Sequence, residues 1–270
     1  MSTRGTFKTA DGLMLEFEVA GRGRPILWQH GLGATFAQPA GVFPTVDGLQ
    51  RITLACRGHE SSDLGEPSQI SFETFADDAL VLLDHLGIER AAVGGISLGA
   101  GITLRLAALY PTRVSRFVMA RPAWVDQPSL ETQGAYLAVA EIIAHHGLSD
   151  GLAVIQQRPE YLALVSASPD NAKSILSYFS RPRPETTMAL LSRISSSFPG
   201  VSREDMAKII APTLIIGNGE DAVHPLAYAK ALSALIPAAR LKVITSKTMN
   251  AAAYEWEFKQ ALAEFLMEPD

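Results

Sequence analysis

The sequence predicts an α/β fold that carries a helical insertion, and three observations support this prediction. Short apolar runs typical of buried strands alternate with stripes of apolar residues at helical spacing. One such run, residues 91–93, leads through a glycine-rich stretch directly into residues with helical spacing. From about residue 127 to residue 205 the pattern is helical, without strands, and is broken by glycine and proline. A chain of 270 residues with 47% hydrophobic content favours one compact domain with an insertion over two independent domains.

Ser97 lies at the centre of the glycine-rich stretch, in the pattern Gly95-Ile96-Ser97-Leu98-Gly99. At a sharp strand-to-helix turn, a serine hydroxyl projects from the sheet edge, and the two flanking glycines let strand and helix approach closely. The amide of Leu98, at the helix N-terminus, is directed toward negative charge that develops beside Ser97. An ordinary glycine-rich turn has the same short pattern, so the context decides its meaning.

The other elements are predicted in chain order. Residues 7–20 alternate around Asp11-Gly12, which predicts a hairpin that opens the sheet. The apolar stripe of residues 72–86 predicts a helix that packs on the sheet. Strands are expected at 25–30, 51–56, 116–123, 213–217 and 241–245, and helices at about 226–235 and near the C-terminus, where Tyr254, Phe258, Ala261, Leu262 and Phe265 form one apolar face.

Four motifs follow these strands in order: His30-Gly31-Leu32-Gly33, Arg57-Gly58-His59, the turn at Ser97, and Asp221 after a late strand. In this order they resemble the α/β-hydrolase family over nearly all of the chain. The resemblance implies a doubly wound, mostly parallel, eight-stranded sheet. It also implies a core of residues 1–126 and 206–270, with residues 127–205 as a helical cap over the active site.

The resemblance further implies a serine nucleophile at Ser97 and an oxyanion hole built from the amides of Leu32 and Leu98. The expected activity is hydrolysis of a small-molecule ester, lactone or related acyl bond, without a cofactor. Hydrolysis of a C–C bond on the same fold, or a ligand-binding or sensor protein on a disabled hydrolase scaffold, remain as alternatives.

The sequence departs from the family at the catalytic base. Family members carry a histidine after the last strand, but residues 246–250 read Ser-Lys-Thr-Met-Asn, and no histidine follows His224. His224 is the first candidate, because Asp221 three residues earlier could orient its ring; the expected separation of roughly 10 Å from Ser97 makes this reach marginal. Lys247 near the usual position is the second candidate. The third possibility is that no base remains.

Other polar residues are expected around the site. His30 is expected to shape its loop through bonds to the backbone and to border the substrate. Arg121 and Trp124 are candidate substrate contacts, and Asp126 is an alternative acid, unless Arg121 and Asp126 pair with each other or with Glu220. The residues that favour an anionic substrate are Arg121, Arg158, Arg181, Arg183 and Arg193.

Composition excludes several classes of function. The formal net charge of −5 and pI near 5.7 give no support for binding nucleic acid or an anionic membrane. No P-loop, G-x-G-x-x-G, H-E-x-x-H or cysteine cluster is present, and His145 and His146 lack companions at metal-ligand spacing, so neither metal nor cofactor is expected. The single cysteine, Cys56, and the lack of an apolar N-terminal stretch favour the cytoplasm. The expected partner is a small-molecule substrate, and the oligomeric state is left open.

Overall fold

The computed structural model describes residues 2–269, which form an eight-stranded sheet in the order β1-β2-β4-β3-β5-β6-β7-β8. The first two pairings in this order are antiparallel and the other five are parallel. The predicted mostly parallel sheet of eight strands is therefore confirmed. The strands are β1 (Ser2–Lys8), β2 (Met14–Gly21), β3 (Gly23–Gln29), β4 (Gly48–Leu54), β5 (Ala91–Ile96), β6 (Val114–Ala120), β7 (Thr213–Asn218) and β8 (Ala239–Ile244).

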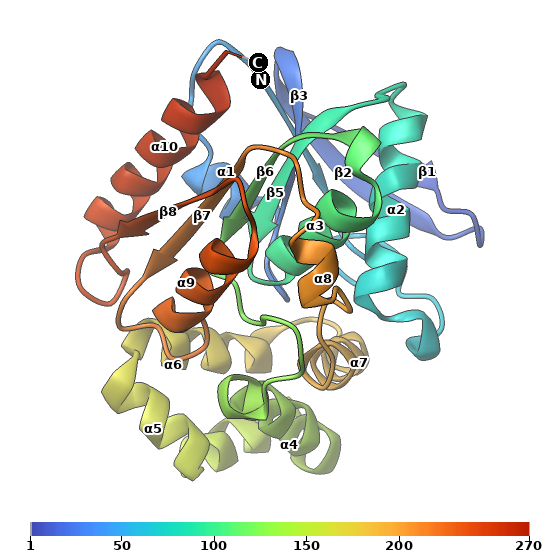
Figure 1. Ribbon diagram of the computed structural model, residues 1–270. Coiled ribbons are helices and arrows are strands. Elements are labelled where there is room, and N and C mark those ends of the chain that lie inside the picture. Colours follow the sequence, from blue (N-terminus) through green and yellow to red (C-terminus); the bar gives the residue numbers. More distant parts are fainter. Residues whose placement is uncertain (1, 270) are drawn as a thin grey trace.

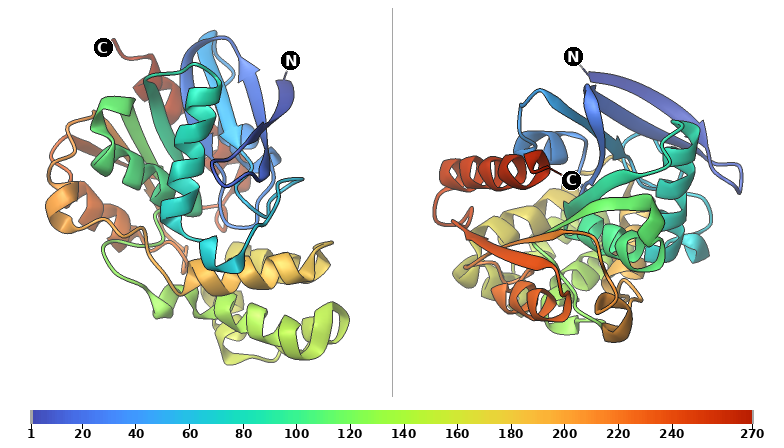
Figure 2. Two further views of the ribbon diagram at one scale, coloured as in Figure 1. Left: turned by 90° about the vertical axis from the view of Figure 1, so that its right-hand side faces the viewer. Right: turned by 45° about the horizontal axis from the view of Figure 1, so that its top comes forward.

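Helices cover both faces of this sheet, as a doubly wound fold requires (Figures 1 and 2). On one face, α2, α3 and α9 bury apolar side chains against the strands; on the other, α1 and α10 form a second hydrophobic cluster. The apolar face predicted for the last helix is buried throughout. The helices of these layers are α1 (Ala37–Val42), α2 (Phe72–His85), α3 (Leu98–Leu109), α8 (Arg203–Met206), α9 (Leu226–Leu235) and α10 (Ala251–Met267), with short 3₁₀ turns η1 (Pro67–Gln69) and η2 (Pro111–Arg113).

Two local predictions can be compared with the strands. The hairpin of β1 and β2 forms around Gly12, whose φ of 92° lies in the left-handed region that glycine tolerates. Strand β6 ends at Ala120, three residues earlier than the pattern predicts. It ends there because Arg121 has a φ of 48°, which is incompatible with extended backbone.

Between β6 and β7 the chain forms a group of helices with its own hydrophobic cluster, here called the helical insertion (residues 130–195). It consists of α4 (Leu130–Ile155), α5 (Pro159–Ala167), α6 (Pro169–Ser177), η3 (Tyr178–Ser180) and α7 (Pro184–Ser195), and it lies at one end of the sheet (Figure 1). Proline begins α5, α6 and α7, the position where its missing amide hydrogen costs no helical bond.

Helix α4 is long and apolar enough, by length and composition alone, to span a membrane, a test that a core helix also passes. Its backbone is kinked at Gly147, and it packs against α7 in the cluster of the insertion.

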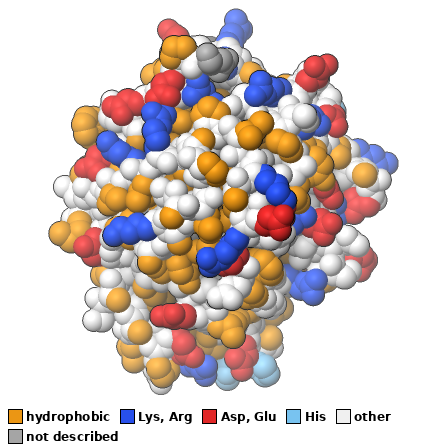
Figure 3. Space-filling model, viewed as in Figure 1, with side chains coloured by type: hydrophobic (Ala, Val, Ile, Leu, Met, Phe, Trp, Pro, Cys, Tyr) orange, Lys and Arg blue, Asp and Glu red, His pale blue; other side chains and the backbone are white. Residues whose placement is uncertain are grey.

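On the outer surface, Lys and Arg side chains are interspersed with Asp and Glu over the face shown in Figure 3.

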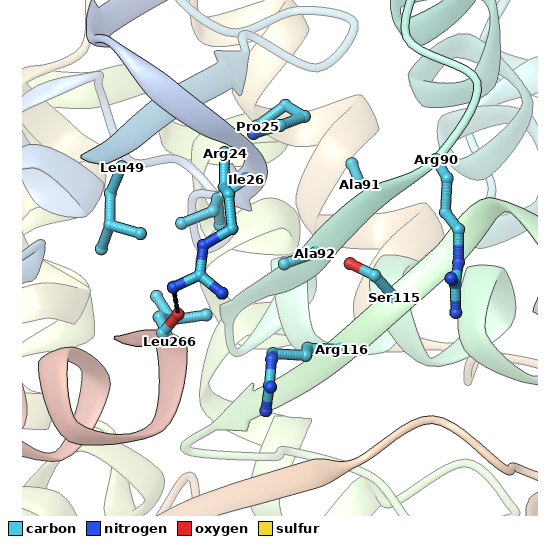
Figure 4. Close-up of a pocket in the computed structure, with 10 residues that line it drawn as sticks. All are labelled: Arg24, Pro25, Ile26, Leu49, Arg90, Ala91, Ala92, Ser115, Arg116 and Leu266. Atoms are coloured by element: carbon cyan, nitrogen blue, oxygen red, sulfur yellow. Dashed lines mark hydrogen bonds between the residues drawn. The ribbon is translucent and has the colours of Figure 1, made fainter. Parts of the chain in front are cut away.

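The amino ends of the parallel strands border a cavity of about 230 Å³ (Figure 4). Arg24, Arg90 and Arg116 line it. Arg24 donates to the carbonyl oxygens of Leu266 and Glu268 at 2.5 and 3.2 Å, and Arg116 donates to that of Glu268 at 3.0 Å. These bonds fasten the end of α10 to the sheet.

Candidate active site

Ser97 lies in a strained turn between β5 and α3. Its φ of 55° and ψ of −109° fall in a region that L-residues seldom adopt. A Cβ atom on Gly95 would lie 2.5 Å from the backbone of Gly99, and one on Gly99 would lie 2.5 Å from the Gln29 carbonyl oxygen. The Ser97 amide donates to the carbonyl oxygen of Ala120 at 3.0 Å, which ties the turn to the end of β6. Both glycines are therefore required by close packing, as predicted for this type of turn.

His224 and Asp221 lie in the turn between β7 and α9, and this turn brings the imidazole to Ser97. The distance from His224 Nε2 to Ser97 Oγ is 2.9 Å, and the distance from His224 Nδ1 to Asp221 Oδ1 is also 2.9 Å. A carboxylate only accepts hydrogen bonds, so Nδ1 carries the hydrogen and Nε2 is free to accept the serine proton. The three residues thus form one continuous hydrogen-bonded chain.

Arg121 holds the second oxygen of Asp221. Its Nε donates to Asp221 Oδ2 at 2.7 Å, and its Nη2 lies 3.8 Å from a carboxylate oxygen of Asp170. Burial by itself raises the pKa of Asp221, but the charge of Arg121 and the bonds to Arg121 and His224 outweigh it and hold this pKa well below its usual range. Asp221 is therefore ionised at neutral pH and keeps one oxygen for the imidazole.

The pKa of His224 is lowered, first by burial and further by the positive charge of Arg121, while Asp221 acts in the opposite direction. A histidine with a lowered pKa is neutral at neutral pH. It can therefore take a proton from Ser97 without first losing one to solvent.

The loop after β3 borders the same site, and Gly31 and Leu32 line the cavity beside Ser97. Cys56 donates its amide hydrogen to His30 Nε2 at 3.1 Å, so His30 Nδ1 carries a hydrogen and donates to the Gly31 carbonyl oxygen at 2.8 Å. In a trans peptide, C=O and N–H point in opposite directions. The Leu32 amide hydrogen is consequently turned away from the imidazole. Leu98 begins α3, where amides lack a partner within the helix.

A cavity of about 340 Å³ opens over Ser97 and His224, between these loops and the helical insertion. Its lining is strongly polar for a small-molecule site. Trp124, Tyr136 and Tyr178 supply aromatic walls; Gln38, Gln133, Asn171, Ser174 and Ser177 supply neutral polar groups; and Lys173 and Lys247 supply positive charge.

The structure places some predicted residues in this cavity and others outside it. Trp124 lines it, and its role as a substrate contact stays a prediction. Lys247 lines it as well, but its Nζ lies 5.4 Å from the ring centroid of Tyr254, and Ser97 is bonded to His224 instead. Arg121 also borders the cavity, with its guanidinium engaged by Asp221 and Asp170.

Two predicted roles need correction. His30 is fully buried and both its ring nitrogens bond to backbone, so it shapes the loop, as expected, but does not border the substrate. Asp126 is not an alternative acid, because its carboxylate pairs with Arg203 on α8. Neither proposed pairing of Arg121, with Asp126 or with Glu220, occurs among residues 2–269; Glu220 instead accepts from the Ser246 hydroxyl at 2.8 Å.

The insertion arginines expected to favour an anion are engaged elsewhere. Arg158 pairs with Glu160, Arg183 donates to the carbonyl oxygens of Gly58, Glu60 and Ser62, Arg193 donates to that of Ser68, and Arg181 stacks on the ring of Tyr178.

The sequence motif Arg57-Gly58-His59 marked His59 but not its role, which is to accept the Gly33 amide hydrogen at 2.8 Å and so support the loop that carries Leu32. Sequence reasoning missed Asn171, Lys173 and Tyr178, which come from α6 and η3. No local pattern marks these three side chains, because only the packing of the insertion on the sheet brings them to the cavity.

Comparison with known proteins agrees with this architecture. Residues 24–246 match the model of the alpha/beta hydrolase fold family, so the chain belongs to the α/β-hydrolase family.

Among its relatives, 2-hydroxymuconate semialdehyde hydrolase of Pseudomonas putida is 28% identical over 251 residues, covering 87% of this chain and 83% of the relative. The 3-oxoadipate enol-lactonase 1 of Acinetobacter baylyi is 26% identical over 217 residues, covering 80% and 77%. The solved enol-lactonase from Burkholderia xenovorans LB400 superposes with a TM-score of 0.77 at 20% identity, covering 98% of this chain and all of that one. The relatives are hydrolases, and the structural likeness shows the same fold.

Proposed function

We propose that this protein is a serine hydrolase that cleaves an ester, lactone or related acyl bond in a small polar molecule. The observation that carries the proposal is the chain from Ser97 through His224 to Asp221, with both hydrogen bonds at 2.9 Å. A serine hydroxyl is a weak nucleophile until a neighbouring base takes its proton. Here that base is His224, which lies in the turn after β7 and not in the loop after the last strand, where other members of the family carry their histidine.

In the proposed reaction, Ser97 Oγ attacks the acyl carbon while its proton passes to His224 Nε2. The negative charge on the former carbonyl oxygen is held by the amides of Leu32 and Leu98, and Asp221 stabilises the imidazolium. His224 then gives the proton to the leaving oxygen, and an acyl-serine remains. Water, deprotonated by His224, attacks this acyl group, and the proton returns to Ser97 as the carboxylic acid leaves.

The cavity favours a short, polar substrate with a negative charge. Lys173 and Lys247 line it, and no ion pair of either ammonium is seen within residues 2–269, whereas Asp170, which also lines the cavity, lies 3.8 Å from Arg121. The anionic preference expected from arginines is thus assigned to these two lysines. The names of the relatives cited above, a muconate and an adipate derivative, refer to acids as well. Replacing both lysines with alanine should raise the KM for a carboxylated ester and leave the KM for the matching neutral ester unchanged.

The proposal is tested by hydrolysis of a short-chain p-nitrophenyl ester between pH 5 and 10, with fluorophosphonate labelling of Ser97 in parallel. We expect Ser97→Ala and His224→Ala to lose activity and Lys247→Ala to retain it. If wild type is no faster than Ser97→Ala and resists labelling, the protein is better explained as a ligand-binding member of the family.

C–C bond hydrolysis is a second candidate, favoured by the relative that acts on 2-hydroxymuconate semialdehyde. The same serine and histidine would serve it. Turnover of that semialdehyde with a kcat/KM far above the best ester would establish it, and turnover of esters alone would exclude it.

A further inference from the structure

We propose that residues 168–178 of the chain, at the start of α6 and in η3, position both halves of the catalytic machinery. In this proposal Asn171 holds the turn that carries the base, and Tyr178 holds the loop that carries the oxyanion donor. The inference rests on the proposed serine hydrolysis. It adds two positioning residues that belong to neither the nucleophile, the base nor the acid.

Two residues of the insertion hydrogen-bond to the turn that carries His224, one on each side of Asp221. Asn171 is 2% exposed, and its Oδ1 accepts the amide hydrogen of Val223 at 3.2 Å. The Ser168 hydroxyl lies 2.8 Å from the carbonyl oxygen of Glu220. Glu220 has a φ of 46°, a conformation that a non-glycine residue keeps only when its surroundings hold it. In our proposal, these contacts hold the turn in the conformation that brings His224 within hydrogen-bond distance of Ser97.

On the oxyanion side, Tyr178 and His59 hold the two ends of one peptide group. The Tyr178 hydroxyl donates to the Leu32 carbonyl oxygen at 2.9 Å, and the Gly33 amide of the same peptide donates to His59 Nε2 at 2.8 Å. The preceding peptide, which contains the Leu32 amide, is fixed by His30. Removing the tyrosine bond frees one end of this arrangement.

The Tyr178 side chain is itself firmly placed. Arg181 lies over its ring, 4.6 Å from the centroid, and Tyr136 packs edge-on at 5.7 Å. Burial raises the pKa of Tyr178 to about 12, so its hydroxyl remains protonated and donates throughout the assay range. Asn171 of α6 and Tyr178 of η3 act on the loops around Ser97 from a segment that follows Ser97 by more than 70 residues.

The two contacts can be separated by their chemistry. A thionoester develops its charge on sulfur, which accepts hydrogen bonds weakly, so it depends less on the oxyanion amides than an ordinary ester does. Tyr178→Phe should lower kcat for the ester by about three- to tenfold, the size expected from one neutral hydrogen bond. KM should be unchanged, and the ratio of ester to thionoester rates should fall, because the thionoester rate decreases less than the ester rate. Asn171→Ala should lower both rates equally, because both reactions need the base.

Two variants within the insertion serve as matched controls. Tyr161→Phe alters a buried tyrosine of α5, and Thr187→Val removes a hydrogen bond from α7 to the carbonyl oxygen of Arg183 at the start of that helix. Both should retain the wild-type rates and rate ratio. Ser168→Ala is the second variant on the base side and should reproduce the loss of Asn171→Ala if that protein does not fold.

Different outcomes separate the two proposals. An active wild type whose rate ratio is unchanged in Tyr178→Phe, or an Asn171→Ala variant with full kcat, overturns the positioning role alone. A wild type without turnover dependent on Ser97 overturns the proposed function, and the positioning role with it.

Discussion

Two buried arginines in this protein make closely similar ion pairs, with different consequences. Arg57 follows β4, and its Nε donates to Asp78 at 2.7 Å; Arg121 follows β6, and its Nε donates to Asp221 at the same distance. The side chains of Asp78 and Asp221 are 4% and 2% exposed. In burial of the carboxylate and in the length of the bond to Nε, the two pairs are alike.

The difference lies in the second oxygen of each carboxylate. Asp78 gives both oxygens to Arg57, with the second bond at 2.9 Å, and burial raises its pKa despite that partner. Asp221 gives Arg121 one oxygen and His224 the other, and its pKa is lowered. A closed, bidentate pair joins parts of the fold, whereas an open pair can orient a base. The third partner of the first pair, Asp11, binds the arginine, and neither oxygen of Asp78 is left free. The comparison teaches that a buried ion pair can orient a base when its carboxylate keeps one oxygen for that base.

The largest effect should come from removing the group that the open pair orients. His224→Ala should lower kcat/KM for a p-nitrophenyl ester by at least about 10⁴-fold, because loss of a triad member typically has an effect of that size. The free energy of unfolding should change little. Lys247→Ala, measured beside it, should stay close to wild type; the reverse pattern would assign the base to Lys247.

Breaking the closed pair should affect stability instead of turnover. Arg57→Met leaves Asp78 buried without its partner, which typically lowers the free energy of unfolding by about 3–5 kcal/mol. Urea unfolding measures this change, and kcat of the folded fraction should remain at the wild-type value. The double variant Arg57→Met/Asp78→Leu should recover much of the loss. A variant with normal stability but reduced kcat would contradict the assignment of this pair to the fold.

Breaking the open pair of Arg121 and Asp221 should lower turnover instead of stability. Arg121→Gln should lower kcat by about 10- to 100-fold, as is typical when the group that orients a ligand or base is lost. Arg121 contributes to the lowered pKa of His224, so its removal raises that pKa. Because the base acts in its neutral form, the acid limb of the kcat/KM profile should move to higher pH. A fall in kcat with an unmoved acid limb would mean that Arg121 acts only on the fold.

The smallest of these effects should come from the buried His30, which should change how the free energy of unfolding depends on pH. Burial lowers the pKa of His30 from 6.5 to about 4, so the unfolded chain binds more protons between these values and stability falls as pH decreases through this window. His30 alone should lower the free energy of unfolding by about 2 kcal/mol between pH 7 and pH 5. Urea unfolding at both values should show a smaller decrease in His30→Gln and an unchanged one in His145→Ala, whose ring is exposed. Equal decreases in all three proteins would contradict the role of His30.

Much of the fold could be predicted because its signals are local. Alternating and helical periodicities depend on neighbours within one element, and they correctly predicted the hairpin, the sheet helices and the buried face of α10. The predicted end of β6 was wrong by three residues, because Arg121 has a positive φ, and its side chain pairs with Asp221, which is 100 positions away in the chain.

By itself, the sequence determined the turn at Ser97, the glycine-rich loop at Leu32 and the proximity of Asp221 to His224, because each depends on residues within a few positions of one another. Only the tertiary structure decided that His224 reaches Ser97, that Arg121 pairs with Asp221, and that Asp126 pairs with Arg203. Ser97 and His224 are 127 positions apart, and the turn between β7 and α9 reaches the serine while Asn171 and Ser168 of the helical insertion contact it. A pairing set by packing between distant segments leaves no periodic or local trace in the sequence.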